Sequence, residues 1–542
     1  MASSERWRLL VFQFLCITCS LRVTLSANKL LLLLVDGMRW DYADRENLSA
    51  FKQIEMQGAR ATKMRPNFPS SSYPNYYSIM TGLHCENHGI VSNCMYDAHK
   101  NETFDMGRNP ESHDSIWWED AEPLWIGAVR QLSLFIWYRF KFVQYTYTFD
   151  LCAHNFCFKQ RKKSFLLSWP TCNVSIHGRK PSVCREYSAE PLQNGASLKE
   201  DLKEAVASLR NNSADFVGVF FGSVDHLGHL YGPNGTKLNS ILKELDGAVA
   251  ELLNITSDMR ETLNIIILAD HGMTSFTKAI NLTERMDLSD LVSFPIKGSL
   301  DVGANVEIWP EIHVDPAELV NKLNNDSWGE RNFTAYLKKD IPERFFYKNH
   351  RRIAPVVVMA DIGYYINSFA SPNLPTFNDT DEHNKTVVRN LGGYHGYDNT
   401  ESDMHAIFYA IGPNFNANSK VDLINNTDVY QVMCKILGIE AAANNGSWAA
   451  MRTLTMFDQL TTSTSPPEST TSSVSSTLSP TLHPQSGGVN AGFVILGLLI
   501  VVVLVIVGVC ICKKYRKREY DDLAYLKNDF SFSRTEYTDR DL

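Results

Sequence analysis

Runs of consecutive hydrophobic residues recur along the chain, and an acidic residue follows three of them within a few positions. These runs and their acids are residues 30–35 with Asp36, residues 216–221 with Asp225, and residues 265–269 with Asp270. Short unbroken apolar runs are typical of buried parallel strands. Helical stretches between them, over Ser197 to Arg210 and Leu238 to Leu253, predict an α/β sheet with helices on both faces. Because ligands bind beyond the carboxyl ends of such strands, we expect the three acids to converge.

The two ends of the chain carry patterns of targeting segments. Residues 1–27 place two arginines before an apolar run, which predicts a secretory signal peptide. Residues 491–512 form an uncharged apolar stretch long enough to span a bilayer, and a basic cluster opens the predicted cytoplasmic tail, residues 513–542. We therefore expect one C-terminal transmembrane helix and a single-pass type I protein of the cell membrane, with its catalytic domain outside the cell.

Composition divides the remainder into a domain and a stalk. Residues 28–460 are long enough for a single large ectodomain, and the Ser/Thr/Pro-rich residues 461–488 predict an extended stalk. Residues 131–163 are unusually aromatic and basic for an insertion, and either a genuine insertion or an artefact of gene prediction explains them. The net charge of −8 shows no pattern that indicates nucleic-acid binding. Scattered Asn-x-Ser/Thr sequons fit a glycosylated, secreted surface.

Histidines join the acids at the predicted strand ends. Asp225 and His229 are four residues apart, which is one helical turn, and Asp270 is followed directly by His271. His395 lies in a glycine-rich loop, where the backbone can approach a site closely. Mixed His and Asp ligands suit zinc, and two such ions can clamp the attacking and leaving oxygens of an in-line displacement. These residues, with Asp36, predict a catalytic metal centre.

A candidate nucleophile lies in residues 66–93. Ser72 stands two positions before Pro74, and an apolar, helix-like run follows. Proline suits the first turn of a helix, so Ser72 is expected at or beside a helix N-terminus, where free N–H groups favour an anion. A hydroxyl placed there could attack a phosphate. The alternative is that Ser72 only caps the helix.

These motifs closely match the nucleotide pyrophosphatase/phosphodiesterase family of the alkaline phosphatase superfamily. The chain resembles it over nearly all of residues 30–450, at Val35-Asp36-Gly37, Ser72-Tyr73-Pro74-Asn75, His88-Gly89, Asp225-x-x-Gly228-His229, Asp270-His271-Gly272 and His395-Gly396-Tyr397. The resemblance implies an alkaline-phosphatase-like mixed sheet flanked by helices and two zinc ions. It implies that one zinc is bound by Asp36, Ser72, Asp270 and His271, and the other by Asp225, His229 and His395. It further implies that Ser72 attacks phosphorus and that Asn93 steadies the phosphate oxygen.

Within the family the chain most resembles the choline-specific glycerophosphodiesterase branch, member six. That resemblance implies hydrolysis of glycerophosphocholine or lysophosphatidylcholine to release phosphocholine. It implies a pocket in which aromatic faces and an acid bind the quaternary ammonium, formed by Tyr76, Phe220, Trp118 and Glu204. It also implies a disulfide between Cys172 and Cys184. Because the ectodomain has an odd number of cysteines, a disulfide-linked homodimer through Cys434 is a further hypothesis.

Three other functions compete with this interpretation. Nucleotide pyrophosphatase activity would keep every metal ligand and change only the substrate pocket, although Ser71 stands where nucleotide-cleaving relatives often carry lysine. A sulfatase or a phosphomonoesterase would need an arginine beside the nucleophile, and none follows Pro74 and Asn75. A non-catalytic cell-surface ectodomain is the third alternative, and a full set of metal-ligating residues argues against it.

Overall fold

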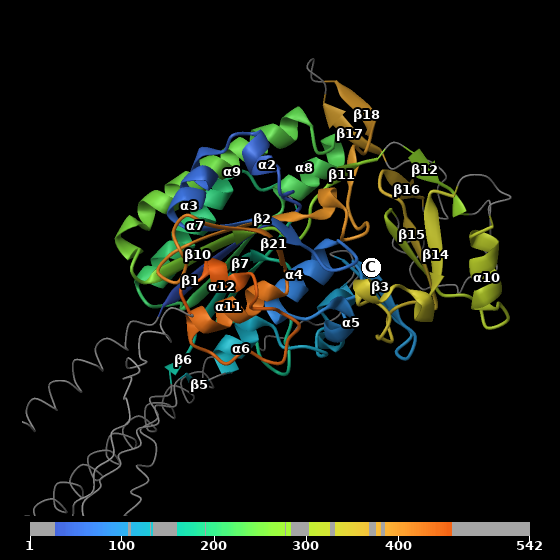
Figure 1. Cartoon of the computed structure of the whole chain (residues 1–542), viewed down its shortest axis with the longest axis horizontal. Coiled ribbons are helices and arrows are strands. Elements are labelled where there is room, and N and C mark those ends of the chain that lie inside the picture. Colours follow the sequence, from blue (N-terminus) through green and yellow to red (C-terminus); the bar gives the residue numbers. More distant parts are fainter. Residues whose placement is uncertain are drawn as a thin grey trace, which may run out of the picture. The chain divides into compact units, whose positions relative to one another are not determined.

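The structure is a computed structural model of the whole chain (Figure 1). The residues that it describes are 28–106, 110–130, 132–133, 160–189, 191–276, 278–282, 303–325, 331–367, 376–380 and 385–457. The predicted signal peptide, stalk and tail, and most of the stretch 131–163, lie outside these ranges.

A mixed eight-stranded sheet forms the centre of the domain, with the order β21-β2-β20-β10-β1-β9-β7-β8. The three strands predicted from apolar runs are β1 (Lys29–Val35), β9 (Phe216–Phe221) and β10 (Leu263–Leu268), and they lie side by side and parallel. The other strands are β2 (Ala59–Arg65), β7 (Ser164–Trp169), β8 (Val183–Glu186), β20 (Ala406–Ile411) and β21 (Ser419–Asn425). Only β20 runs antiparallel to its neighbours, so the predicted mixed sheet is confirmed.

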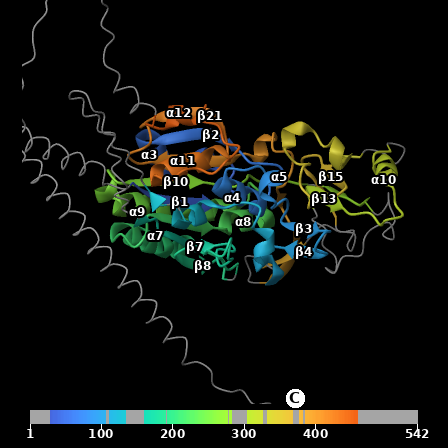
Figure 2. The ribbon, with the colours of Figure 1, turned by 90° about the horizontal axis from the view of Figure 1, so that it is seen from below.

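Helices cover both faces of this sheet (Figures 1 and 2). On one face α3 (Ser49–Gln57), α7 (Gly195–Arg210) and α9 (Thr236–Ile255) pack together. On the other, α11 (Asp428–Leu437) packs on β1 and contacts α4 (Ser72–Thr81) and α6 (Leu124–Arg130). The short helices are α2 (Tyr42–Arg45), α5 (Cys85–His88), α8 (Ser223–Tyr231) and α12 (Met451–Leu454). The central strands β1, β9 and β10 are buried on both faces, which explains why their sequences are continuous or nearly continuous apolar runs.

A second, smaller hydrophobic core lies around a three-stranded antiparallel sheet. Its strands are β13 (Asn305–Ile308), β15 (Val356–Ala360) and β14 (Phe333–Leu337), and α10 (Pro316–Leu323) packs on it. Pairs of short strands complete the described structure: β3 (Cys94–Asp97) with β4 (Glu102–Asp105), β5 (Leu132–Ser133) with β6 (Gln160–Arg161), β11 (Thr274–Ser275) with β19 (Gly393–Tyr394), β12 (Lys278–Ile280) with β16 (Tyr364–Ile366), and β17 (Thr376–Thr380) with β18 (Thr386–Asn390).

The membrane span requires a correction to the predicted fold class. Among the residues that the structure describes, no helix is both long enough and apolar enough to cross a bilayer. The α/β domain fits the prediction, whereas the transmembrane helix added to it has no counterpart in this part of the chain. Residues 491–512, to which that prediction refers, lie outside the described ranges.

Among the cysteines in the described ranges, one pair forms a disulfide. Cys172 and Cys184 are bonded, with their Cα atoms 5.7 Å apart, as the resemblance implies. Cys434 lies on α11 with 1% of its surface exposed, and burial raises the pKa of its thiol to about 12. A thiol enclosed in this way is poorly placed to bond a second chain, so burial counts against the disulfide-linked dimer, which stays a prediction.

Candidate active site

The candidate ligands lie at the carboxyl ends of the central strands. Asp36 follows β1, the pair Asp270 and His271 follows β10, and α8, which carries Asp225 and His229, follows β9. His395 comes directly after the two-residue strand β19. Parallel neighbours in one sheet end at the same edge, so three distant segments meet there. The sequence argument from strand ends therefore placed these side chains together correctly.

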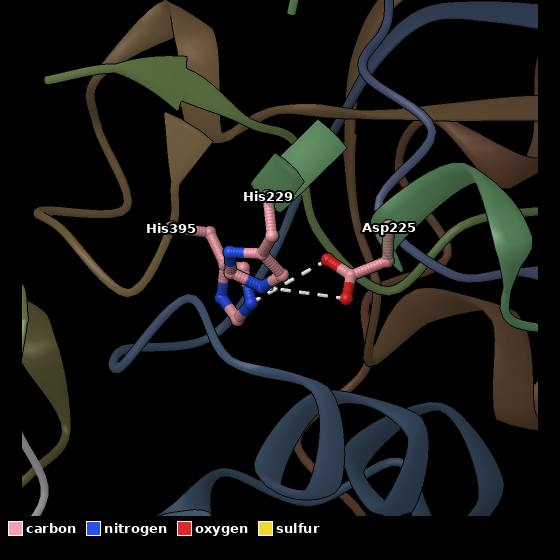
Figure 3. Close-up of side chains that lie close together, drawn as sticks. All are labelled: Asp225, His229 and His395. Carbon is pink, nitrogen blue, oxygen red and sulfur yellow. Dashed lines mark ion pairs between the residues drawn. The ribbon is translucent and has the colours of Figure 1, made fainter. Parts of the chain in front are cut away.

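Two overlapping groups form within this set. In the first, shown in Figure 3, Asp225 faces two imidazoles: its Oδ2 lies 3.4 Å from Nε2 of His229, and its Oδ1 lies 3.5 Å from Nε2 of His395. In the second, Asp225 lies beside Asp36 and His271. Nε2 of His271 is 3.3 Å from Oδ1 of Asp36. Asp225 thus belongs to both groups, which the resemblance alone did not imply.

Backbone carbonyls orient all three imidazoles in the same way. The Nδ1 atom of His229 lies 3.0 Å from the carbonyl oxygen of Gly393, that of His395 lies 3.0 Å from that of Ser70, and that of His271 lies 2.8 Å from that of Gly272. A carbonyl oxygen can only accept, so each Nδ1 must carry a proton and donate it. In the neutral rings this leaves the lone pair on Nε2, and all three Nε2 atoms face the carboxylates. Metal-ligating histidines are oriented in this manner.

Burial and neighbouring charges shift the pKa values of the acids and of His271 in this cluster. Burial, together with the carboxylates of Asp270 and Asp225, raises the pKa of Asp36 well above its ordinary value. Burial also raises the pKa of Asp270. Burial lowers the pKa of His271, but Asp270 and Asp36 outweigh burial and raise it to about 10. Carboxylates crowded in this way repel one another unless cations lie between them.

Two buried carboxylate oxygens bear on whether these residues fit metal ions. Oδ1 of Asp225 and Oδ2 of Asp270 are both buried and form no hydrogen bond; the imidazole nitrogens that face them, Nε2 of His395 and Nε2 of His271, lie 3.5 Å and 3.6 Å away. A buried carboxylate oxygen without a partner is costly, and bound cations are a usual remedy. Together with the three convergent Nε2 atoms, these oxygens form the mixed His and Asp donor set that zinc prefers. The residues therefore fit the implied metal ions.

Ser72 lies at the first position of α4, where the sequence predicted a helix N-terminus. Its Oγ is 3.1 Å from Nε2 of His271 and 3.5 Å from Oδ1 of Asp36. The residue at the N-cap is Ser71, and its side chain makes no capping hydrogen bond. The alternative role for Ser72, capping the helix, is therefore not what the structure shows.

Asn93 is held against the same helix terminus. Its Oδ1 accepts a hydrogen bond of 3.0 Å from the backbone N–H of Tyr73. Because a backbone N–H can only donate, this bond fixes which way the amide points and turns its NH₂ group away from the helix. Asn93 lines a cavity beside Ser72, so this NH₂ group is available to an anion bound there.

The cavity beside Ser72 is lined by residues from the carboxyl edge of the large sheet and from the smaller core, to which Ala304 belongs. Its described lining residues are Ser71, Ser72, Asn93, Met106, Asp225, His229, Ala304, Asn305, Tyr394, His395 and Gly396. Sequence reasoning did not identify Met106, Ala304, Asn305 or Tyr394. Tyr394 is adjacent to His395 in sequence, which was an available signal. Asn305 gave none, because it comes from β13 of the smaller sheet.

The four residues predicted to bind choline are not gathered at this cavity. Phe220, Tyr76 and Trp118 are at most 3% exposed and pack among other aromatic rings. Glu204 lies on α7 and pairs with Arg185, 2.7 Å away. None of the four lines the cavity beside Ser72. The predicted choline pocket therefore has no counterpart among the described lining residues.

Comparison with known proteins identifies the family. The profile described as type I phosphodiesterase/nucleotide pyrophosphatase matches residues 30–398, which is most of the described domain. The chain belongs to this family. The chain is therefore a hydrolase of the phosphodiesterase and pyrophosphatase class. This family is metal-dependent.

The relatives found indicate which members this chain is similar to. Ectonucleotide pyrophosphatase/phosphodiesterase family member 5 of Homo sapiens is 28% identical over 460 residues, covering 81% of this chain and 82% of the relative. The bis(5'-adenosyl)-triphosphatase ENPP4 of Homo sapiens is 30% identical over 442 residues, covering 80% and 82%. A solved structure of murine member 5, an inactive threonine-to-alanine variant in complex with AMP, matches with a TM-score of 0.64 at 27% identity and covers 79% of this chain and all of that one. The family prediction is confirmed, but these relatives do not support the specific resemblance to member six.

Proposed function

We propose that this protein hydrolyses nucleotide phosphodiester and pyrophosphate bonds, with Ser72 as the nucleophile. The observation that carries the proposal is the placement of the Ser72 hydroxyl at a helix N-terminus, beside three carboxylates and three imidazoles whose Nε2 atoms converge. The helix terminus favours the negative phosphoryl group. The surrounding ligand set favours cations that would neutralise it.

The metal centre in this proposal contains two zinc ions. Asp36, Ser72, Asp270 and His271 would bind one ion, and Asp225, His229 and His395 would bind the other. Bound zinc would supply charge neutralisation and would lower the pKa of the attacking hydroxyl. The buried oxygens of Asp225 and Asp270 that form no hydrogen bond support this assignment.

The protein's own groups account for orientation and for the covalent step. Ser72 Oγ forms a bond to phosphorus while the bond from phosphorus to the leaving oxygen breaks, and the hydroxyl proton is released to solvent. The NH₂ group of Asn93 and the backbone N–H of Ser72, the first residue of α4, would donate to the phosphoryl oxygens, because the N–H of Tyr73 already donates to Asn93 and Pro74 has none. Water then cleaves the phosphoseryl ester and restores the hydroxyl.

The charge of the cavity favours a diester over a monoester. Among the described residues that line it, none is Lys or Arg, so no side chain there could pair with the second charge of a dianionic monoester. The neutral Asn93 suits the single charge of a diester. A nucleotide substrate is favoured over a choline diester because the predicted choline residues lie elsewhere. The relative named as a bis(5'-adenosyl)-triphosphatase and the solved structure of murine member 5 in complex with AMP point the same way.

We also propose that the domain acts outside the cell. The Cys172–Cys184 disulfide supports this location, because disulfides persist in oxidising compartments and are rare in the cytosol.

A substrate panel tests the proposed specificity. Purified protein is assayed with a dinucleoside triphosphate, glycerophosphocholine and lysophosphatidylcholine, using Ser72→Ala as the blank. We expect the dinucleoside triphosphate to give the highest kcat/KM, with AMP among the products. Faster hydrolysis of either choline ester would overturn the nucleotide assignment while leaving the metal centre intact.

A further inference from the structure

One buried carboxylate joins the segments that carry three of the candidate ligands. Asp379 lies on β17, and 7% of its side chain is exposed. Its Oδ1 accepts hydrogen bonds from the Tyr231 hydroxyl, at 2.8 Å, and from Lys237 Nζ, at 2.7 Å. Its Oδ2 accepts from Arg389 Nε at 2.9 Å. This carboxylate thus accepts hydrogen bonds from two cations and a hydroxyl; charged hydrogen bonds are the stronger kind, and exposure of about half of the Lys237 and Arg389 side chains weakens their share.

The donors come from different elements. Tyr231 is the last residue of α8, the helix that carries Asp225 and His229. Lys237 lies in the first turn of α9. Arg389 is on β18, six residues before His395 in the sequence. Asp379 therefore connects the end of one ligand-bearing helix to the strand that leads into the loop of the third ligand.

The same two segments also meet through their backbones. The N–H of Gly392 donates to the carbonyl of His229 at 2.8 Å, and Nδ1 of His229 donates to the carbonyl of Gly393 at 3.0 Å. The approach is close: a Cβ atom on Gly392 would lie 2.5 Å from the backbone nitrogen of Gly232. Any shift of the β17–β18 hairpin relative to α8 would therefore move the His229 ring and the His395 loop relative to each other.

We propose that Asp379 is a positioning residue for the metal centre. It fixes the β17–β18 hairpin on the end of α8, and thereby maintains the position of His395 relative to Asp225 and His229. Asp379 belongs to neither group of candidate ligands and does not line the cavity beside Ser72. This inference rests on the metal centre of the proposed function and adds the group that maintains its geometry. Zinc sites require ligand positions accurate to about 0.2 Å, so a small loosening of this tie is expected to weaken binding.

The test measures zinc affinity rather than turnover. Full-length wild-type protein and Asp379→Asn are titrated with zinc against a chromophoric chelator. The isosteric amide keeps the volume and loses the charge. We expect the apparent affinity of the weaker zinc to fall about tenfold, at the lower end of the range for residues that support ligands. Added zinc is expected to restore kcat in this variant, whereas Ser72→Ala stays inactive at any zinc concentration.

The matched control is Asp422→Asn, the same substitution at an exposed position on the outer strand β21. Its zinc affinity is expected to equal that of the wild type. Tyr231→Phe removes one donor and leaves the carboxylate in place. If Asp379→Asn does not fold, the zinc affinity of Tyr231→Phe tests the proposal instead. We expect Tyr231→Phe to reduce zinc affinity by a few fold.

The outcomes separate the two proposals. If the wild type binds no zinc, the metal centre itself is wrong. If the wild type binds two zinc ions and Asp379→Asn binds them equally tightly, Asp379 is structural only and this inference is overturned. A lower melting temperature with unchanged zinc affinity leads to the same conclusion.

Discussion

The substitution Gly37→Ala, which adds one methyl group, is expected to abolish metal binding although it changes none of the proposed ligands. Gly37 follows Asp36 and has a φ of +67°, a conformation that L-residues adopt at a cost. Its N–H donates to Oδ1 of Asp270 at 3.2 Å. A Cβ atom at this position would lie 2.8 Å from both Cβ and Oδ1 of Asp225 and 2.9 Å from its Cα. Gly37→Ala therefore presses on the carboxylate shared by both groups of ligands.

Two effects add in this variant. The left-handed backbone conformation costs an alanine about 1–2 kcal/mol of unfolding free energy. The contact with Asp225 must lengthen by roughly half an ångström to become ordinary, and the backbone of Asp225 takes part in it. That displacement exceeds the tolerance of about 0.2 Å for zinc ligands. We expect zinc affinity to fall at least about a hundredfold, with activity lost in parallel.

Gly438→Ala is the matched control. Gly438 has a φ of +64°, and a Cβ atom there would have nothing within 4 Å. It therefore carries the backbone cost without the collision. Chemical denaturation in the absence of metal, and zinc content after dialysis against a weak chelator, are measured for both variants. We expect Gly438→Ala to lose about 1–2 kcal/mol of unfolding free energy and Gly37→Ala to lose more because of the collision, with loss of zinc only in Gly37→Ala.

The reasoning is refuted if Gly37→Ala retains both zinc ions and near-normal kcat. It is also refuted if Gly438→Ala loses zinc to the same extent, because general destabilisation would then explain the result.

Three further predictions concern single residues. Ser72→Ala is expected to lower kcat on the order of a thousandfold or more while most zinc is retained, as measured by steady-state kinetics and metal analysis. His395→Ala is expected to lower zinc content and activity together, and unchanged zinc would remove it from the ligand set. Burial lowers the pKa of His88 from 6.5 to about 3, so below pH 6.5 the unfolded chain binds a proton that the folded protein does not. The contribution of His88 to the unfolding free energy of the metal-free protein is therefore expected to fall by about 2 kcal/mol from pH 8 to pH 5, measured as the difference between wild type and His88→Gln in urea titrations at each pH.

The parts of the site that the sequence predicted are those set by local pattern. An unbroken apolar run identifies a buried parallel strand, and the residues after it must lie at the carboxyl edge of the sheet. This reasoning placed Asp36, Asp225 and Asp270 together. Pro74 placed Ser72 at a helix start, which the structure confirms.

The features that the sequence did not predict depend on which way a side chain points and on packing between segments that are distant in the chain. Phe220 lies on a strand buried on both faces, so its position does not reveal which neighbours its ring contacts; it packs against Trp169 and Tyr187. Glu204 lies on a half-exposed helix, and its pairing with Arg185 depends on β8. Asn305 reaches the cavity only because the smaller sheet packs beside the larger one. No spacing along the chain encodes that arrangement.

The pairing of β1 has a consequence for folding kinetics. Leu30 lies opposite Phe216 on one side and Asn264 on the other. Both partners of β1 therefore lie much later in the chain, and β1 can pair only after the long intervening segments have closed. Closing such long loops is entropically costly, and folds with high contact order cross their barrier slowly. The ligands at the strand ends come together only after these pairings form. If the proposed zinc ions bind only to this assembled site, they would not accelerate folding; they would slow unfolding and so increase the kinetic stability of the folded domain.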